Sequence, residues 1–410
     1  MIGGQTNGAP FSEGGWRSPL AALRRRWLIL TLLGSLLIVL GCYSLAVWWQ
    51  PGYAIRWGLV AALILIYETI LLWRLLKHNH RPGEKALLPS LGIGNVITVA
   101  RGWLLALLAG FLCAPRPSGW LEWAPSALYL MAAIADYLDG YLARITQHST
   151  LLGEELDLQY DALGILIAPL LGVLYGQLPI WYLTVGLARY LFMAGTWLLK
   201  RRGRPVYNLT PSSARRAMAG FQMGFTAVAL WPIFAPPGTW IVATLFMLPF
   251  IVGFLRDWLV VSGAIDPYSA RYTEGIRRGV EMTTGWLPLG VRALVVPASL
   301  WLTAQRWAGN ISAGGASWSW QTGKGVFEAT AATLVGLGIL GRLSSLALLI
   351  TVGLTVAENH PYPGDLLVIA GATLLTILGT GKLSLWKPED EFLRRRYGGG
   401  HNQIEDGDRD

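Results

Sequence analysis

Four aspartates lie inside two otherwise apolar stretches of the chain. Asp136 and Asp139 are three residues apart, and Asp157 and Asp161 are four apart, so each pair shares one face of a helix. A carboxylate is costly at bilayer depth, so such a cluster indicates a functional site. Facing carboxylates must be neutralised by protons or cations, and all-oxygen ligands suit hard divalent ions such as Mg²⁺ or Mn²⁺. Two such ions about 3.5–4 Å apart would clamp a pyrophosphate for displacement.

Two helices joined by a turn must bring these carboxylates together. The spacing predicts one helix that ends near Ala143 and a second that starts near Gly153, with a loop around residues 145–152. The small residues Gly140, Ala143 and Gly153 lie on the acidic faces, so the two faces are expected to oppose each other closely.

The complete pattern, D-x2-D-G-x2-A-R-x8-G-x3-D-x3-D, resembles that of the CDP-alcohol phosphatidyltransferase family. Its positions are Asp136, Asp139, Gly140, Ala143, Arg144, Gly153, Asp157 and Asp161. Upstream, GNVITVAR resembles the family's PN-x-(I/L)-T-x-x-R entry through Asn95, Thr98 and Arg101, with Gly94 in place of proline. The resemblance covers residues 89–263. It implies six membrane helices that transfer a phosphatidyl group from a CDP-linked donor, often CDP-diacylglycerol, to an alcohol, with release of CMP.

The same resemblance implies roles for individual residues. Two divalent metal ions, Mg²⁺ or Mn²⁺, would be held by Asp136, Asp139, Asp157 and Asp161. Asp161 would also act catalytically, as general base for the acceptor hydroxyl. The residues expected to bind the nucleotide are Asn95, Thr98, Gly140, Ala143, Arg144 and Gly153.

Two arginines bear on the acceptor. Arg189 and Arg216 lie in segments that resemble the glycerophosphate-using branch of the family, although Tyr190 stands where that branch has glutamate. Guanidinium groups bind phosphate through two hydrogen bonds, so both arginines are expected to bind the phosphate of an acceptor such as glycerol 3-phosphate or inositol phosphate. Arg216 has an alternative reading, as an anchor of its helix at the membrane interface.

Composition indicates an all-α polytopic membrane protein. Of 410 residues, 53% are hydrophobic and only 14% are charged, and several apolar runs reach the length that spans a bilayer. The 20 tryptophans fit aromatic belts at the membrane interfaces. The net charge of +9 comes from Lys and Arg beside apolar runs, which indicates contact with anionic lipid and not with nucleic acid.

The expected organisation has about twelve transmembrane helices in groups of two, six and four. The predicted parts are a cytoplasmic tail (1–25), a two-helix addition and linker (26–88), the transferase domain (89–263), a linker (264–283), a four-helix unit (284–388) and a charged tail (389–410). The four-helix unit resembles DoxX-like membrane proteins through Gly341, Arg342 and Leu343 and, later, through Gly379, Gly381, Ser384 and Leu385. With the N-terminus inside, the basic segments fall on the cytoplasmic side, as do the aspartates.

Alternatives remain at this level. A CDP-amino-alcohol could donate to diacylglycerol, or the four-helix unit could dominate as a membrane scaffold with a catalytically silent transferase half. A transporter is less favoured, because the spans carry few charges outside the motif. The expected partners are CDP-diacylglycerol or another CDP-alcohol, a small alcohol acceptor and the lipid bilayer. The resemblance also implies a homodimer as one arrangement.

Overall fold

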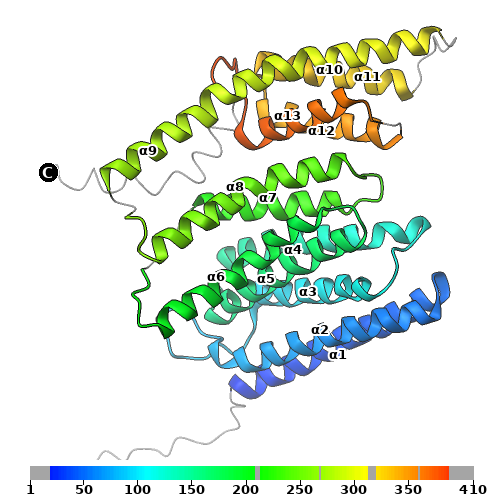
Figure 1. The fold of residues 1–410 in the computed structure, drawn as a ribbon. Coiled ribbons are helices and arrows are strands. Elements are labelled where there is room, and N and C mark those ends of the chain that lie inside the picture. The colour runs from blue at the N-terminus through cyan, green and yellow to red at the C-terminus, as the bar shows by residue number, and fades with distance from the viewer. Residues whose placement is uncertain (1–18, 208–212, 267–268, 313–319, 359–360, 387–410) are drawn as a thin grey trace, which may run out of the picture. The chain divides into compact units, whose positions relative to one another are not determined.

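The computed structural model describes residues 19–207, 213–266, 269–312, 320–358 and 361–386. These residues form thirteen α-helices, and their only β-pairing is an isolated bridge between Ile339 and Trp386 (Figure 1). By length and composition, seven helical segments of this described part could cross a membrane: Pro19–Trp48, Pro51–His78, Gly92–Cys113, Leu151–Leu174, Gly238–Val261, Ala270–Gly309 and Gly341–Glu358. The predicted all-α polytopic architecture is confirmed.

The chain divides into two compact units, and the first comprises residues 1–114 and 131–161. Its described helices are α1 (Pro19–Trp48), α2 (Pro51–Leu75), α3 (Gly92–Ala109), the second half of α4 (Ala124–Ile145) and the first half of α5 (Leu151–Leu174). Pro51 begins α2, where a missing N–H costs nothing. The predicted two-helix addition and the aspartate-bearing helices therefore share one compact unit.

The second unit comprises residues 115–130 and 162–410. Its described helices include the remainder of α4 and α5, then α6 (Leu183–Arg201), α7 (Ser213–Ala229) and α8 (Gly238–Val261). They continue as α9 (Ala270–Glu281), α10 (Leu287–Ser312), α11 (Trp320–Leu337), α12 (Gly341–Glu358) and α13 (Pro363–Leu378). One apolar core joins Val242 and Phe246 of α8 to Val295, Val352 and Ile369 of the C-terminal helices.

A buried arginine connects α10 to the end of α11 and to the segment after α13. Arg292 of α10 donates hydrogen bonds to the carbonyl oxygens of Thr380, at 3.0 Å, of Lys382, at 3.2 Å, and of Gly336. The Gly336 carbonyl lies in the last turn of α11, where it has no helical partner, and Thr380 and Lys382 belong to the segment that follows α13. The short segment after α13, which has the sequence GTGKLSLW, is thereby fixed to the C-terminal helices.

Two features refine the sequence-based organisation. Each of the twelve predicted spans contains a helix, but five of those helices do not meet the length and composition of a span, so the count of twelve stays a prediction. The predicted linker 264–283 contains α9, which continues through a short π-helical turn, Met282–Trp286, into α10. The predicted domain boundaries also stay predictions.

Candidate active site

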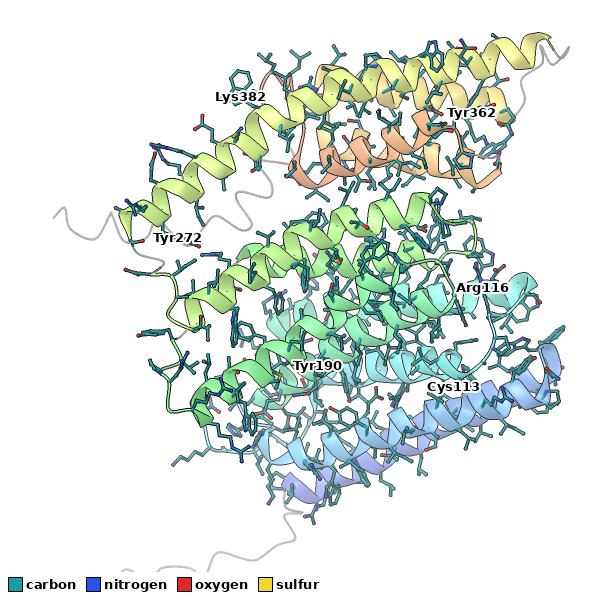
Figure 2. The ribbon with its side chains drawn as sticks, viewed as in Figure 1. Cys113, Arg116, Tyr190, Tyr272, Tyr362 and Lys382 are labelled. Atoms are coloured by element: carbon teal, nitrogen blue, oxygen red, sulfur yellow. The ribbon has the colours of Figure 1, made fainter. Side chains whose placement is uncertain are left out.

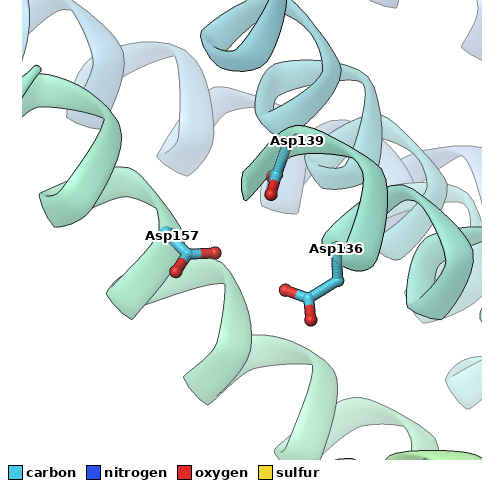
Figure 3. A group of neighbouring side chains, drawn as sticks. All are labelled: Asp136, Asp139 and Asp157. Carbon is cyan, nitrogen blue, oxygen red and sulfur yellow. The ribbon is translucent and has the colours of Figure 1, made fainter. Parts of the chain in front are cut away.

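Three aspartates from two helices converge in the first unit. Asp136 and Asp139 project from α4 and Asp157 from α5, and one carboxylate oxygen of each lies within 4.8 Å of the others (Figure 3). Asp139 is buried, with 5% of its surface exposed, whereas Asp136 and Asp157 are half-exposed. The cluster is therefore buried on one side and accessible to solvent on the other.

Arg101 of α3 lies among these carboxylates. Its side chain is 2% exposed and forms ion pairs with Asp136, with Asp157 at 2.8 Å and with Asp161 at 3.4 Å. A second hydrogen bond from Nη2 reaches the carbonyl oxygen of Asp157 at 3.1 Å. Arg101 thus connects Asp161 to Asp136 and Asp157, two of the three clustered aspartates.

The donor set fits a hard divalent cation. Arg101 brings one positive charge to four carboxylates, so negative charge remains in excess at the cluster. All the clustered ligand atoms are carboxylate oxygens, which Mg²⁺ and Mn²⁺ prefer. The aspartate triad could hold a metal ion.

A layer of hydrogen bonds orients the cluster from behind. Thr98 Oγ1 donates to Asp139 Oδ2 at 2.8 Å, and Asn95 Nδ2 donates to Thr150 Oγ1 at 2.9 Å. The same Thr150 hydroxyl accepts a hydrogen bond from the Gly153 N–H at 3.2 Å, which caps the start of α5. Partners of this kind fix the direction of the carboxylates and tune a site for metal.

The small residues of the motif differ in what surrounds them. A Cβ on Gly153 would collide with the Asn95 side chain, so glycine is needed there for packing. A Cβ on Gly140 would meet only the Arg144 Nη1 atom, at 3.3 Å. Ala143 packs against Gly94 of α3, where a Cβ would lie 3.0 Å from the alanine Cβ. Arg144 is exposed near the end of α4.

The two-helix addition also contacts the start of α5. His78, just after α2, lies with Nδ1 3.0 Å from Glu155 Oε1, and the His80 carbonyl accepts from the Leu151 N–H at 3.1 Å. Inside the unit, the buried Glu68 of α2 lies next to Gly102 of α3. The Tyr160 ring of α5 lies against the same glycine. The addition therefore supports the helices that carry the aspartates.

The predicted acceptor arginines are on other helices. Arg189 is half-buried on α6, beside the exposed Tyr190 (Figure 2). Arg216 falls in α7, but its side chain lies outside the described residues. Phosphate binding by both arginines stays a prediction.

Two residues of the site were not assigned a role from the sequence. In the sequence, Arg101 is a position of the family's entry pattern, three residues after Thr98 on the same helix face, but this spacing does not identify its ion-pair partners. Thr150 lies directly before α5, and its hydroxyl accepts from the N–H three residues later, at Gly153. A threonine at the start of a predicted helix is a typical N-cap, so this signal could have identified Thr150.

This fold and this cluster define a helical membrane protein with an aspartate site that could hold a metal ion. The family model "CDP-alcohol phosphatidyltransferase" matches residues 91–265, so this part of the chain is a CDP-alcohol phosphatidyltransferase domain. The match ends before the C-terminal helices, and the resemblance of residues 284–388 to DoxX-like proteins stays a prediction.

Curated relatives carry names from the same chemistry. A "putative cardiolipin synthase" of Mycobacterium tuberculosis is 29% identical over 141 residues, which are 34% of this chain and 65% of the relative. A "CDP-diacylglycerol--glycerol-3-phosphate 3-phosphatidyltransferase" of Cereibacter sphaeroides is 34% identical over 25% of this chain and 48% of the relative. One with the same name from Pseudomonas fluorescens is 38% identical over 19% of this chain and 39% of the relative. No solved structure matches the chain.

Proposed function

We propose that this protein is an integral-membrane enzyme of phospholipid synthesis. It transfers a phosphatidyl group from a CDP-linked donor, CDP-diacylglycerol, to an alcohol acceptor and releases CMP. The observation that carries the proposal is the convergence of Asp136, Asp139 and Asp157 in a CDP-alcohol phosphatidyltransferase domain. A pyrophosphate donor needs its oxygens neutralised before the bond between the phosphates can break.

Each side chain then has a defined task. Two divalent cations, Mg²⁺ or Mn²⁺, held by the four aspartates would neutralise the pyrophosphate oxygens. The hydroxyl oxygen of the acceptor forms a bond to the phosphorus that carries the diacylglycerol, and Asp161 accepts the proton of that hydroxyl. The bond between that phosphorus and the bridging oxygen breaks, and the electron pair leaves with CMP.

The chain's own contacts orient this reaction. Arg101 holds Asp161 and Asp157 toward each other through its ion pairs, and Thr98 fixes the direction of Asp139. Gly140 leaves the backbone of α4 open to close approach by the cytidine, and the exposed Arg144 binds a donor phosphate. Asn95, Ala143 and Gly153 complete the nucleotide side of the site.

For the acceptor we propose a phosphorylated alcohol, glycerol 3-phosphate or inositol phosphate. Arg189 and Arg216 would bind its phosphate. The names of the relatives from Cereibacter sphaeroides and Pseudomonas fluorescens favour glycerol 3-phosphate. The mycobacterial name makes a lipid acceptor the second candidate. Basic segments such as residues 24–26 and 200–204 support a cytoplasmic site, where soluble acceptors are available.

Release of CMP by the purified protein tests the reaction. Protein in detergent is given CDP-diacylglycerol, Mg²⁺ or Mn²⁺, and each of glycerol 3-phosphate, inositol phosphate, inositol, serine and phosphatidylglycerol in turn. We expect metal-dependent release with one acceptor and a loss of roughly 10²–10⁴-fold in Asp161→Asn. Glu154→Gln is the matched control, because Glu154 is an exposed carboxylate on the same helix.

The alternatives give different results in the same assay. If label from a CDP-amino-alcohol enters lipid with diacylglycerol as acceptor, the direction of transfer proposed here is wrong. If neither CDP-diacylglycerol nor a CDP-amino-alcohol binds or reacts, the protein is a scaffold with a silent transferase half.

A further inference from the structure

An apolar cavity of about 450 Å³ lies within the second unit. Its walls come from α7 and α8, which belong to the transferase domain, and from α12 and α13 of the C-terminal helices. Figure 1 locates these four helices. A volume of this size is in the range of ligand pockets, which are lined mainly by apolar and aromatic side chains. Since α8 and α12 are long and apolar enough to span a membrane, we expect lipid chains to surround this cavity.

The cavity follows one face of α8. Thr239, Val242 and Phe246 line it at i, i+3 and i+7, a length of roughly 10 Å along the helix. The ring of Phe246 stacks on Phe225 of α7 with 5.1 Å between centroids and 9° between planes. The interior is thus apolar from the second turn of α8 onward.

A single unsatisfied hydroxyl marks the other end of this face. Thr239 is 8% exposed, lines the cavity, and its Oγ1 has no hydrogen-bond partner in the described part of the chain. A buried hydroxyl without a partner costs free energy, so a bound group that accepts a hydrogen bond would be favoured there. Thr239 lies in the first turn of α8, close to the Pro236–Pro237 turn that also borders the cavity.

Glycines keep the cavity open on the side of α7. Gly220 and Gly224 both line it, and a Cβ built on either would meet no atom within 4 Å. A side chain at position 224 would therefore start in open space and extend into the cavity.

We propose that this cavity binds an ester-linked acyl chain of a membrane lipid, with its ester carbonyl accepting a hydrogen bond from Thr239. The chain lies along α8 toward Phe246, between the transferase helices and the C-terminal helices. The C-terminal helices therefore supply one wall of a lipid site that the transferase domain alone lacks. This proposal does not depend on the transferase reaction.

Photo-crosslinking in nanodiscs tests the site. The full chain is reconstituted with phosphatidylglycerol that carries a diazirine on one acyl chain, irradiated, and mapped by peptide mass spectrometry. We expect saturable labelling on the cavity segments of α8 and α12. Gly224→Leu should lower it at least fivefold, whereas Gly253→Leu, also in open space but away from the cavity, should not change it.

A second comparison isolates the hydroxyl. A diether analogue lacks the carbonyl group, so wild-type protein should prefer the diester by about fivefold, the worth of one hydrogen bond of about 1 kcal/mol. Thr239→Val should abolish this preference. Thr244→Val should retain it, because the half-buried Thr244 does not line the cavity and its hydroxyl bonds to Trp240 of its own helix and to Trp181. Monodispersity and the thermal midpoint of Gly224→Leu, compared with Gly253→Leu, establish that it is folded.

The outcomes separate the possibilities. Displacement of the label by CDP-diacylglycerol at much lower concentration than by phosphatidylglycerol identifies the chain as that of the donor lipid, and equal displacement identifies any diacyl lipid. Equal labelling of Gly224→Leu and Gly253→Leu, or labelling spread evenly over all lipid-facing helices, overturns the proposal.

Discussion

Arg101 of α3 donates a hydrogen bond from Nη2 to Oδ1 of Asp157 on α5, across 2.8 Å. The guanidinium is buried, and its Nη1 atom faces Asp136 and Asp161. One side chain from outside the eight-position motif therefore contacts three of its four aspartates. Because like charges repel, the closeness of the carboxylates depends on this arginine together with bound cations or protons.

Replacing Arg101 should make folding depend on metal. In Arg101→Met, the half-exposed carboxylates of Asp136, Asp157 and Asp161 lose their counter-charge. Because solvent screens them in part, we expect the free energy of unfolding to fall by about 1–3 kcal/mol in buffer with chelator. Mg²⁺ should restore more stability to the variant than it adds to wild type, because more negative charge is left for it to bind. Thermal unfolding in detergent, with EDTA and with Mg²⁺, measures both.

Arg101→Lys is the control for charge. It retains a cation but loses the planar fork, so its midpoint should fall between those of wild type and Arg101→Met. If Arg101→Met and wild type had equal thermal midpoints when both are measured in EDTA, the ion pairs of Arg101 would contribute nothing to stability.

Alanine substitutions at Gly140 and Gly153 should distinguish a glycine needed for substrate access from one needed for helix packing. Gly140→Ala meets only the flexible end of Arg144 and gains helix propensity of about 1 kcal/mol, so stability should be kept or raised. Its activity should nevertheless fall, because the methyl group narrows the approach of the cytidine. Gly153→Ala should lower both stability and activity, since the added Cβ would collide with the Asn95 side chain. CMP release and thermal midpoints of the two variants check this.

Gly253→Ala on α8 is the matched control, because a Cβ there meets no atom within 4 Å. Full activity of Gly140→Ala would remove Gly140 from the nucleotide site.

The sequence predicted the convergence of α4 and α5 because spacing alone puts Asp136 with Asp139 on one helix face, and Asp157 with Asp161 on another. It could not assign Arg101 a partner. Its contacts depend on how α3 docks against two helices that begin more than twenty residues later, and no local pattern fixes that packing. The same limit applies to Thr239, whose unsatisfied hydroxyl becomes visible only where four helices enclose it.

The helix α9 shows a different limit. Its charged sequence indicated a linker, but Tyr272, Ile276 and Val280 lie on one face while Arg277, Arg278 and Glu274 lie on the other. Glu274 pairs with both arginines at i+3 and i+4, which supports the helix without burial.

Thr98→Val should weaken the site with little change of shape. The substitution removes the hydrogen bond to Asp139 and leaves a buried carboxylate oxygen with one partner fewer, at a cost of about 1–3 kcal/mol. Loss of such an orienting partner typically lowers metal affinity roughly 10–100-fold. The Mg²⁺ concentration for half-maximal CMP release measures the effect. Thr31→Val, which removes a bond only to its own helix, should leave that concentration unchanged.

Removal of metal should abolish the reaction reversibly. EDTA should stop CMP release, and Mg²⁺ or Mn²⁺ should restore it, because hard cations suit the carboxylate set. Asp157→Asn removes one of the clustered carboxylates and should raise the required Mg²⁺ concentration roughly tenfold or more. Activity that persists through exhaustive chelation, or Asp157→Asn with wild-type metal dependence, would contradict a metal site at this cluster.

The C-terminal helices contain a second buried ionic group, which should be structural. Arg306 of α10 pairs with Asp365 and lies 3.6 Å from Glu328, whose Oε1 also accepts from Thr303 at 3.0 Å. Arg306→Met would leave both carboxylates without this cation among apolar helices, so we expect the free energy of unfolding to fall by about 3–5 kcal/mol. The matched control is Lys382→Met, which breaks the exposed pair with Glu281 and should change stability by less than about 1 kcal/mol (Figure 2). The thermal midpoints of both variants in detergent measure the difference.

A double variant, Arg306→Met with Glu328→Gln, should regain part of the lost stability, because the second change removes an uncompensated charge. A further loss of stability in the double variant would show that Glu328 is held by other groups.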